Sequence, residues 1–493
     1  MSIQTDDSSE SSRFPLTSRV KLWGELLAAL TVLLAIVGMA VTSPPLVGPD
    51  EPAHQATAYY TSVNILPPER EADYYTPGIF KQGACTAFDS TKDASCALPR
   101  EDSWPAKVRV LNYPPPYYWV VALGQKAMPG TDDWLDIGGR LASLLLNVGA
   151  LGLLALLARR VTTSWGTYLL LISTPMAAFL WAVVNPNGWE VTSGLLFAFL
   201  FATAWWNWDV GLNRGLSGWA RVLLVTAASL AFALSRHDAA VWMCLLVLTV
   251  FLMGPSPLQR SEKVRLLGAF LIGLIAAVLW QLTHPAIHEP NNDDPIKDPT
   301  GLNYLHWLGQ IDEMLPERLR QMVGVLGWLD TPVPYTLAIL LMLGWALLIG
   351  IMYARRHIPL GVLATGFAAT IFVPTALELL RWNDWPFWYQ GRITLSFTLP
   401  FLFLLLLRFA DSSSRAAIAL SLITSLALAF MVWQNLMRYA FGTKDYIPLR
   451  WTDPAIGGFW FWIGTLVVVA IVLVTIARAW LLVLGYRRRS IAP

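Results

Sequence analysis

The sequence predicts an all-α, polytopic integral membrane protein with about twelve transmembrane helices. Of its 493 residues, 55% are hydrophobic and only 14% are charged, and the mean hydropathy is +0.50. The apolar residues gather in segments of about 20, the length that a helix needs to cross the hydrocarbon core of a bilayer. The polar residues gather in a few long connections between these segments. A soluble domain does not have this composition.

Twelve apolar segments account for about half of the chain, and we expect each to form a helix. The two segments between 219 and 253 are short and could form one bent hairpin. A further apolar stretch at 115–128 is too short to span, so we expect it at the membrane interface. The twelve segments lie near residues 22–42, 138–158, 164–184, 189–208, 219–235, 239–253, 264–283, 335–353, 359–379, 391–408, 415–433 and 457–483.

Basic residues predict the orientation of the chain. Pairs such as Arg159–Arg160 and Arg355–Arg356 fall in alternate short connections, and positive residues concentrate on the cytoplasmic side. We therefore expect a cytoplasmic tail at 1–21, a single transmembrane domain at 22–486 and a basic cytoplasmic tail at 487–493. Both termini are then inside, which requires an even number of spans. The first span is long and reads as an uncleaved signal anchor.

The long connections then lie outside the cell. We expect external loops at 43–137, 284–334, 380–391 and 434–456, and because they are long and polar we expect the function on this side. The first loop contains Cys85 and Cys96, which are close in sequence and in an oxidising compartment can form a disulfide. Cys244 falls in an apolar segment, where we expect it to be buried.

The stretch GPDEPAH at 48–54 follows the first span directly and places two carboxylates, Asp50 and Glu51, between two prolines. Asp50 could simply cap the helix that Pro52 begins. That explanation leaves Glu51 and His54 without a role, and carboxylates beside a low-dielectric slab are costly unless they have a partner or a task. We therefore expect Asp50 and Glu51 to act in catalysis. The three side chains could also hold a divalent metal, Mg²⁺ or Mn²⁺.

Other polar residues at the external ends of the predicted helices are candidates for substrate binding. Several also have a simpler structural explanation: helix capping for Asp330, headgroup contact for the arginines and an interfacial position for the tyrosine. The candidates are His54, Glu190 in NPNGWE, Arg236, His237, Asp330 in GWLDTPVP, Arg392 in WYQGR and Tyr117 in NYPPPYY.

An acidic pair just after the first transmembrane helix, in a large first external loop, resembles the GT-C superfamily of membrane glycosyltransferases. PDEPAH, NYPPPYY, NPNGWE, GWLDTPVP and WYQGR together also resemble a bacterial family of predicted membrane proteins of unknown function. The resemblance covers residues 20–440. It implies a GT-C-like fold and transfer of a sugar from a polyprenyl-phosphate donor, with Asp50 as general base. The acceptor would be a lipid or glycan of the cell envelope. The transfer would take place on the external face of the bacterial plasma membrane, as a step of cell-wall biosynthesis.

Two other classes of function remain open. A transporter or flippase of a lipid-linked envelope intermediate would use Asp50, Glu190 and Arg236 as coupling or substrate groups. A non-catalytic scaffold for envelope assembly would not need the acidic corner that Asp50 and Glu51 form. The sequence has no nucleotide-binding loop and no zinc-ligand spacing. Its net charge of +2 gives no indication of a nucleic-acid partner, so membrane lipid and lipid-linked substrates are the expected partners.

Overall fold

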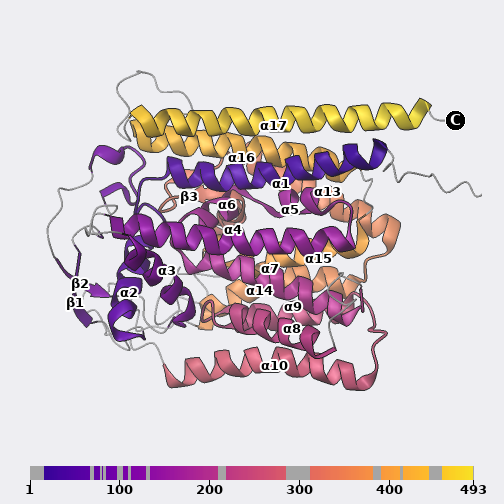
Figure 1. The fold of residues 1–493 in the computed structure, drawn as a ribbon, viewed down its shortest axis with the longest axis horizontal. Helices are drawn as coiled ribbons and strands as arrows, with labels where there is room; N and C mark the ends of the chain where they lie inside the picture. The colour runs from indigo at the N-terminus through magenta and orange to yellow at the C-terminus, as the bar shows by residue number, and fades with distance from the viewer. Residues whose placement is uncertain are drawn as a thin grey trace, which may run out of the picture.

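The computed structural model is a bundle of helices with two short antiparallel sheets (Figure 1). It describes residues 16–66, 72–77, 80, 85–96, 104–108, 113–128, 134–208, 218–284, 311–380, 390–410, 415–442 and 458–491. The elements of the first half are α1 (Leu16–Thr42), α2 (Glu51–Asn64), β1 (Ala72–Thr76), η2 (Ala94–Cys96), β2 (Trp104–Val108), α3 (Pro116–Ala127), α4 (Leu135–Val161), α5 (Trp165–Ile172), α6 (Pro175–Ala182), α7 (Pro186–Trp205), α8 (Gly218–Ala233) and α9 (Ala239–Leu252). Those of the second half are α10 (Arg260–Thr283), α12 (Ile311–Gly324), β3 (Val325–Leu326), β4 (Thr331–Pro332), α13 (Tyr335–Arg356), α14 (Leu360–Leu380), η4 (Gly391–Thr394), α15 (Leu395–Phe409), α16 (Arg415–Phe441) and α17 (Gly458–Ile491).

Eight helical stretches in the described part of the chain are long and apolar enough to cross a membrane, or nine if a bent pair of helices counts as one span. The prediction of a helical, polytopic membrane protein is therefore confirmed. The eight include α1, α4, α10 and the four helices from α13 to α16, with η4 extending α15, and they end with α17. The helices α8 and α9 are apolar but shorter.

The bent pair, α5 and α6, turns by 88° in the middle of the bundle. The bend has a local cause, because Thr174 accepts a hydrogen bond from the amide of Ala177 and Pro175 begins α6. Every residue of both helices is buried. The bend directs the end of α6, and the α6–α7 junction after it, towards the segment that follows α1.

The helices α1, α16 and α17 pack side by side along one edge of the bundle, and α10 lies at the opposite edge (Figure 1). The start of α1 and the end of α17 are on the same side. At that side Arg478 of α17 donates to the carbonyl of Gly24 and to the hydroxyls of Thr167 and Ser421. These bonds satisfy a buried guanidinium and join the edge helices to α5.

The predicted first external loop, 43–137, gathers at the other end of the bundle. Its described parts include α2, α3 and the antiparallel pair of β1 and β2 (Figure 1). The stretch at 115–128 forms α3, a helix of only 12 residues. Two expectations are wrong. Residues 434–441 continue α16 because this part of the helix packs its polar side chains against other segments. Cys244 is exposed on α9 because it shares an outward face of the helix with the exposed side chains of Val241 and Leu248.

A disulfide joins Cys85 to Cys96 and closes a short loop over the end of α16. Arg438 is almost fully buried beneath this loop and donates to the backbone carbonyls of Thr86, Asp89 and Lys92. The loop therefore serves as a carbonyl cradle for a buried cation.

We expect the double variant Cys85→Ser/Cys96→Ser to destabilise this loop by up to about 3 kcal/mol, because the crosslink restricts a short unfolded loop. Hydrogen exchange of residues 85–96 should accelerate, while exchange of the bundle helices stays unchanged. Cys244→Ser is the matched control and should have no effect. Unchanged protection in the double variant would show that Arg438 alone orders the loop.

Candidate functional site

The segment between α1 and α2 is a tight, proline-rich turn. Pro44 and Pro45 end α1, since proline has no N–H and clashes with the preceding turn. Gly48 leaves no room for a side chain, because a Cβ there would lie 2.9 Å from both Glu51 Oε2 and Val183 Cβ. Asp50 adopts a left-handed conformation with φ of 58°, which Asp tolerates better than most residues. The two carboxylates consequently leave the turn in different directions.

Glu51 points into the protein and has no exposed surface. Its two oxygens accept from Nε and Nη2 of Arg140 on α4, at 2.9 and 2.5 Å, and from the backbone amides of Val184 and Gly48, at 3.0 and 2.9 Å. Arg140 also donates to the carbonyls of Ser43 and Pro44. This buried ion pair fastens the turn to α4 and to the α6–α7 junction.

Asp50 points the other way and remains accessible, with 49% of its side chain exposed. The expected helix cap is absent, since the carboxylate makes no hydrogen bond to the first turn of α2. Instead its Oδ2 accepts from Nη2 of Arg392 at 3.0 Å. Arg392 lies in η4, 342 residues further along the chain, where the 3-10 turn buries its side chain.

Arg392 has donors to spare. In the described part of the chain its Nε and Nη1 are buried and have no hydrogen-bond acceptor, although only 7% of the side chain is exposed. An unpaired buried N–H costs about 1–3 kcal/mol, more on a charged group, so a native structure leaves such groups only where something else binds or strain is used. The guanidinium is therefore prepared to receive an anion beside Asp50.

A second charged group lies deeper. Arg236, in the turn between α8 and α9, has its Nε 3.7 Å from Oε2 of Glu190 and 3.3 Å from Oδ1 of Asp238. All three side chains are at least nine-tenths buried. The guanidinium carbon of Arg236 lies 5.6 Å from the ring centroid of Tyr113, in a cation–π contact. Two carboxylates thus share one arginine in the protein interior.

Aromatic side chains connect the two groups. Tyr113 makes edge contacts with His237, His54 and Tyr118, at centroid distances of 5.3, 6.0 and 6.4 Å. His54 Nδ1 and the Tyr118 hydroxyl share a hydrogen bond of 2.9 Å. Burial lowers the pKa of His54 to about 3, although the charge of Asp50 acts in the opposite direction. His54 is therefore neutral at physiological pH.

The remaining two candidates take part in packing: the ring of Tyr117 lies 5.6 Å from that of Tyr118, at the border of the aromatic group, and Asp330 pairs with Arg438. Tyr117 is buried and shares a hydrogen bond of 2.9 Å with Ser143 of α4, so its ring has no face free for a sugar. Asp330 lies 3.4 Å from Arg438, beside the disulfide loop, and burial raises the pKa of its carboxyl. Both residues serve packing at the same end of the bundle.

The expected metal site of Asp50, Glu51 and His54 does not fit this geometry, because the three side chains face different partners. Both oxygens of Glu51 are occupied by Arg140 and backbone amides, and His54 faces Tyr118. Within the described ranges, no group of three or more His, Cys, Asp or Glu side chains is placed to hold a metal ion. Of the three, Asp50 alone offers an accessible ligand.

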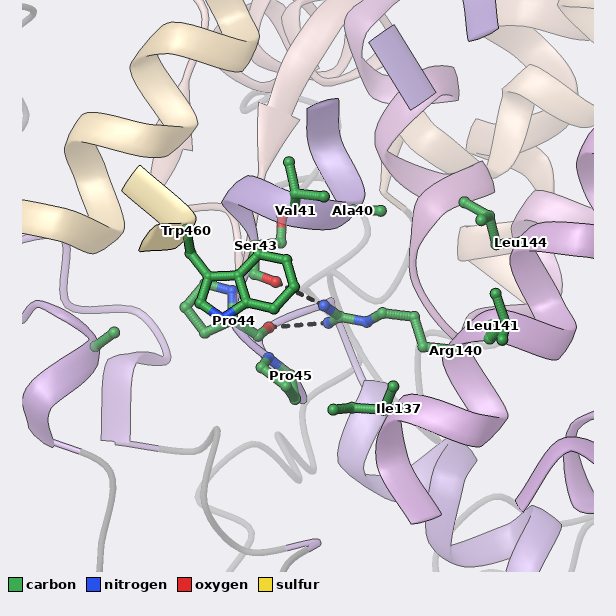
Figure 2. Close-up of a pocket in the computed structure, with 11 residues that line it drawn as sticks. Ala40, Val41, Ser43, Pro44, Pro45, Ile137, Arg140, Leu141, Leu144 and Trp460 are labelled. Carbon is green, nitrogen blue, oxygen red and sulfur yellow. Dashed lines mark hydrogen bonds between the residues drawn. The ribbon is translucent and has the colours of Figure 1, made fainter. Parts of the chain in front are cut away.

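An apolar pocket of about 460 Å³ adjoins the turn. It lies between the end of α1, the start of α4 and the start of α17. Figure 2 shows Arg140 at its wall, donating to Ser43 and Pro44, and Trp460 as a further lining residue. Ile137 and Leu141 of α4 line the pocket and are themselves exposed on the outer face of the bundle. A pocket of this kind is accessible from the surface that faces lipid.

Sequence reasoning missed several members of the site. Arg140 was detectable, because an arginine inside an apolar span needs a buried partner. Asp238 follows the predicted pair Arg236 and His237 directly, and it was overlooked as a third charge in one turn. Residues 381–389 of the predicted external loop at 380–391 lie outside the described residues.

These features define a class: a polytopic membrane protein with a buried ion-pair network and an accessible Asp–Arg pair at one end of its bundle. The chain belongs to the family described as predicted membrane protein (DUF2142), whose model matches residues 33–393. A search of curated proteins found no match, and a search of solved structures found none either.

We expect Glu51→Gln to lower the free energy of unfolding by about 3 kcal/mol or more, because it leaves the buried Arg140 without its counter-charge. The melting temperature in detergent, followed by tryptophan fluorescence, measures this. Glu317→Gln, which breaks a partly exposed pair with Arg320, is the control and should change stability by less than about 0.5 kcal/mol. Equal melting temperatures for the two variants would contradict the anchoring role.

Acid should destabilise the protein through His54. Its pKa is about 3 in the folded state and about 6.5 when unfolded, so below pH 6.5 the unfolded state binds the proton more readily. Stability is lost as the pH falls from 6.5 towards 3, and His54 alone accounts for about 2 kcal/mol at pH 5. The melting temperature of His54→Gln should depend less on pH than that of the wild type. His357→Asn, which replaces an exposed histidine, should keep the wild-type dependence.

Proposed function

We propose that the protein is a GT-C-type glycosyltransferase that moves a sugar from a polyprenyl-phosphate donor to a cell-envelope lipid or glycan. The observation that carries the proposal is the pair of Asp50 and Arg392. A half-exposed carboxylate lies against a buried guanidinium whose Nε and Nη1 have no hydrogen-bond acceptor among the described residues. A phosphate group needs such a cation, and an acceptor hydroxyl needs such a base.

The proposed reaction is a single displacement at the anomeric carbon of the donor sugar. Asp50 takes the proton from the acceptor hydroxyl while the acceptor oxygen bonds to that carbon. The bond from this carbon to the phosphate oxygen breaks, and the polyprenyl phosphate leaves with the electron pair. Arg392 stabilises the charge on the departing phosphate. The carboxylates of Glu190 and Asp238 already offset the charge of Arg236, so we assign stabilisation of the departing phosphate to Arg392 alone.

Binding of the donor would also release the base. In the free protein the carboxylate of Asp50 is occupied by Arg392. A phosphate that takes over the guanidinium leaves Asp50 free to accept a proton from the second substrate. Glu51 has no part in this step. Its role is to keep the turn in place while the Asp50–Arg392 contact is exchanged.

The apolar pocket supports the lipid-linked nature of the donor. It adjoins the same turn as Asp50 and is lined mainly by alanine, valine, isoleucine, leucine and proline side chains. A hydrocarbon chain that enters from the lipid-facing side of α4 meets no charge except Arg140, which is already paired. A divalent cation, where the reaction uses one, would be held by Asp50 and the donor phosphate.

We place the site on the external face of the bacterial plasma membrane, with both termini in the cytoplasm. The basic residues of the short connections support this orientation. We propose that the bent pair of α5 and α6, together with α7, α8 and α9, also crosses the membrane, which would add four crossings to the eight long stretches. An even number of crossings agrees with the shared side of the start of α1 and the end of α17.

A transporter of a lipid-linked intermediate is the second candidate. The observation that favours it is the buried group of Glu190, Arg236 and Asp238, since intramembrane charges of this kind often couple to ions or protons. The two proposals differ in what they deliver. A glycosyltransferase forms a new glycosidic bond in detergent, whereas a transporter gives a signal only across a sealed membrane.

We expect Asp50→Asn to lower the turnover number 10²–10⁴-fold, the usual effect of removing a general base. Asparagine also tolerates the left-handed conformation at this position, so expression should stay at the wild-type level. Because Asp50 is half exposed, losing its pair with Arg392 should lower the melting temperature much less than Glu51→Gln does. The measurement is incorporation of labelled sugar from a panel of polyprenyl-phosphate donors into lipid or glycan.

Two further variants sharpen this test. Arg392→Lys keeps the positive charge but loses the planar guanidinium with its paired N–H donors. It should therefore weaken donor binding more than it lowers the turnover number of the bound complex. Asp93→Asn changes a carboxylate that accepts from Ser95 in the disulfide loop and should be fully active. Wild-type turnover in Asp50→Asn with the true donor would exclude Asp50 as the base.

A further inference from the structure

The end of the bundle opposite the acidic corner carries a second polar group, centred on the turn Trp205–Trp208 that follows α7. This helix begins at Pro186, close to the site, and has 20 residues, so its far end lies roughly 30 Å away. We propose that this turn binds the phosphate of an anionic phospholipid. The proposal is independent of the chemistry at Asp50.

Basic side chains from two other helices lie over the indole rings of this turn. The guanidinium carbon of Arg408, at the end of α15, is 5.5 Å from the ring centroid of Trp206 and 6.0 Å from that of Trp208. The ammonium of Lys263, in the first turn of α10, is 6.0 Å from the ring centroid of Trp205. Cation–π contacts fix the direction of these charges while leaving their N–H groups free.

A third cation reaches the same turn from α8. Nη1 of Arg221 donates to Oδ1 of Asn207 at 3.0 Å, and its Nε is buried without a hydrogen-bond partner. Three helices that are distant in sequence therefore direct positive charge to four consecutive residues. Among the residues that the structure describes, no carboxylate forms an ion pair with Arg221, Lys263 or Arg408.

The turn also carries donors of its own that have no acceptor. The indole N–H groups of Trp205 and Trp206 are buried and unpaired within the described part of the chain, and only 6% of Trp206 is exposed. A buried N–H normally has a partner. The group is thus rich in donors and poor in acceptors, and a ligand that complements it must supply several acceptor oxygens and negative charge.

The position of the turn selects the source of that ligand. Each of the three basic residues lies at the end of an apolar helix, at the level where headgroups meet the hydrocarbon. A phospholipid phosphate carries the charge and the acceptor oxygens, and its acyl chains run along the exposed faces of α8 and α10, as at Leu223 and Leu271. Free inorganic phosphate offers the same oxygens without the chains.

The test uses the full-length protein in detergent, titrated with short-chain phosphatidylglycerol and followed by native mass spectrometry. A cation near the surface contributes about 1 kcal/mol to such binding, so Arg408→Gln should weaken affinity about fivefold, and Lys263→Gln/Arg408→Gln about 25-fold. Arg408→Lys should retain most of the affinity, because it keeps the charge. Its melting temperature also shows whether the position tolerates substitution.

The matched control is Arg355→Gln/Arg356→Gln. It removes two exposed arginines at the end of α13, and it should leave the affinity unchanged. Phosphatidylcholine of the same chain length should bind at least tenfold more weakly than phosphatidylglycerol. Equal loss in the control, or equal affinity for the two lipids, would overturn the proposal. If millimolar inorganic phosphate occupied the site as effectively as the lipid, the ligand would be free phosphate, and the proposal of a phospholipid would be overturned.

Discussion

The structure of the candidate site depends on one buried ion pair, between Glu51 and Arg140. A carboxylate with no exposed surface is tolerated only where charge and hydrogen bonds replace the lost water. Glu51 meets this requirement with four donors, from α4, the α6–α7 junction and its own turn. The same bonds that satisfy the charge bring three separate segments together. These bonds to Glu51 also fix the conformation of the turn, and with it the direction of the Asp50 side chain.

The polar face at the end of α16 provides a second support for the same turn. Asn435 donates to the hydroxyls of Thr42 and Ser43, where α1 ends. One turn further on, Arg438 gathers the carbonyls of the disulfide loop and lies near Asp330. The approach to the acidic corner is therefore held from α4 on one side and from α16 on the other. Residues that looked like substrate contacts in the sequence, such as Asp330, serve this support.

Much of the fold could be predicted from the sequence because hydropathy acts locally. A run of about 20 apolar residues must be helical in a bilayer, where no water satisfies the backbone. The position of Asp50 after the first span was predictable for the same reason. The contact between Asp50 and Arg392 was not, since it joins residues 342 positions apart and depends on how the helices pack. The bend between α5 and α6 was missed because their combined hydropathy resembles that of one straight helix.

The different roles of Asp50 and Glu51 show where sequence reasoning reaches its limit. Two adjacent carboxylates have the same chemistry on paper, and both were expected to act in catalysis. A positive φ at Asp50 sends one towards Arg392 and leaves the other buried against Arg140. An accessible group can exchange partners when a ligand arrives, whereas a buried and fully bonded group cannot do so without a large loss of stability. The proposed chemistry therefore belongs to Asp50, and Glu51 provides the rigidity that makes an exchange at Asp50 reversible.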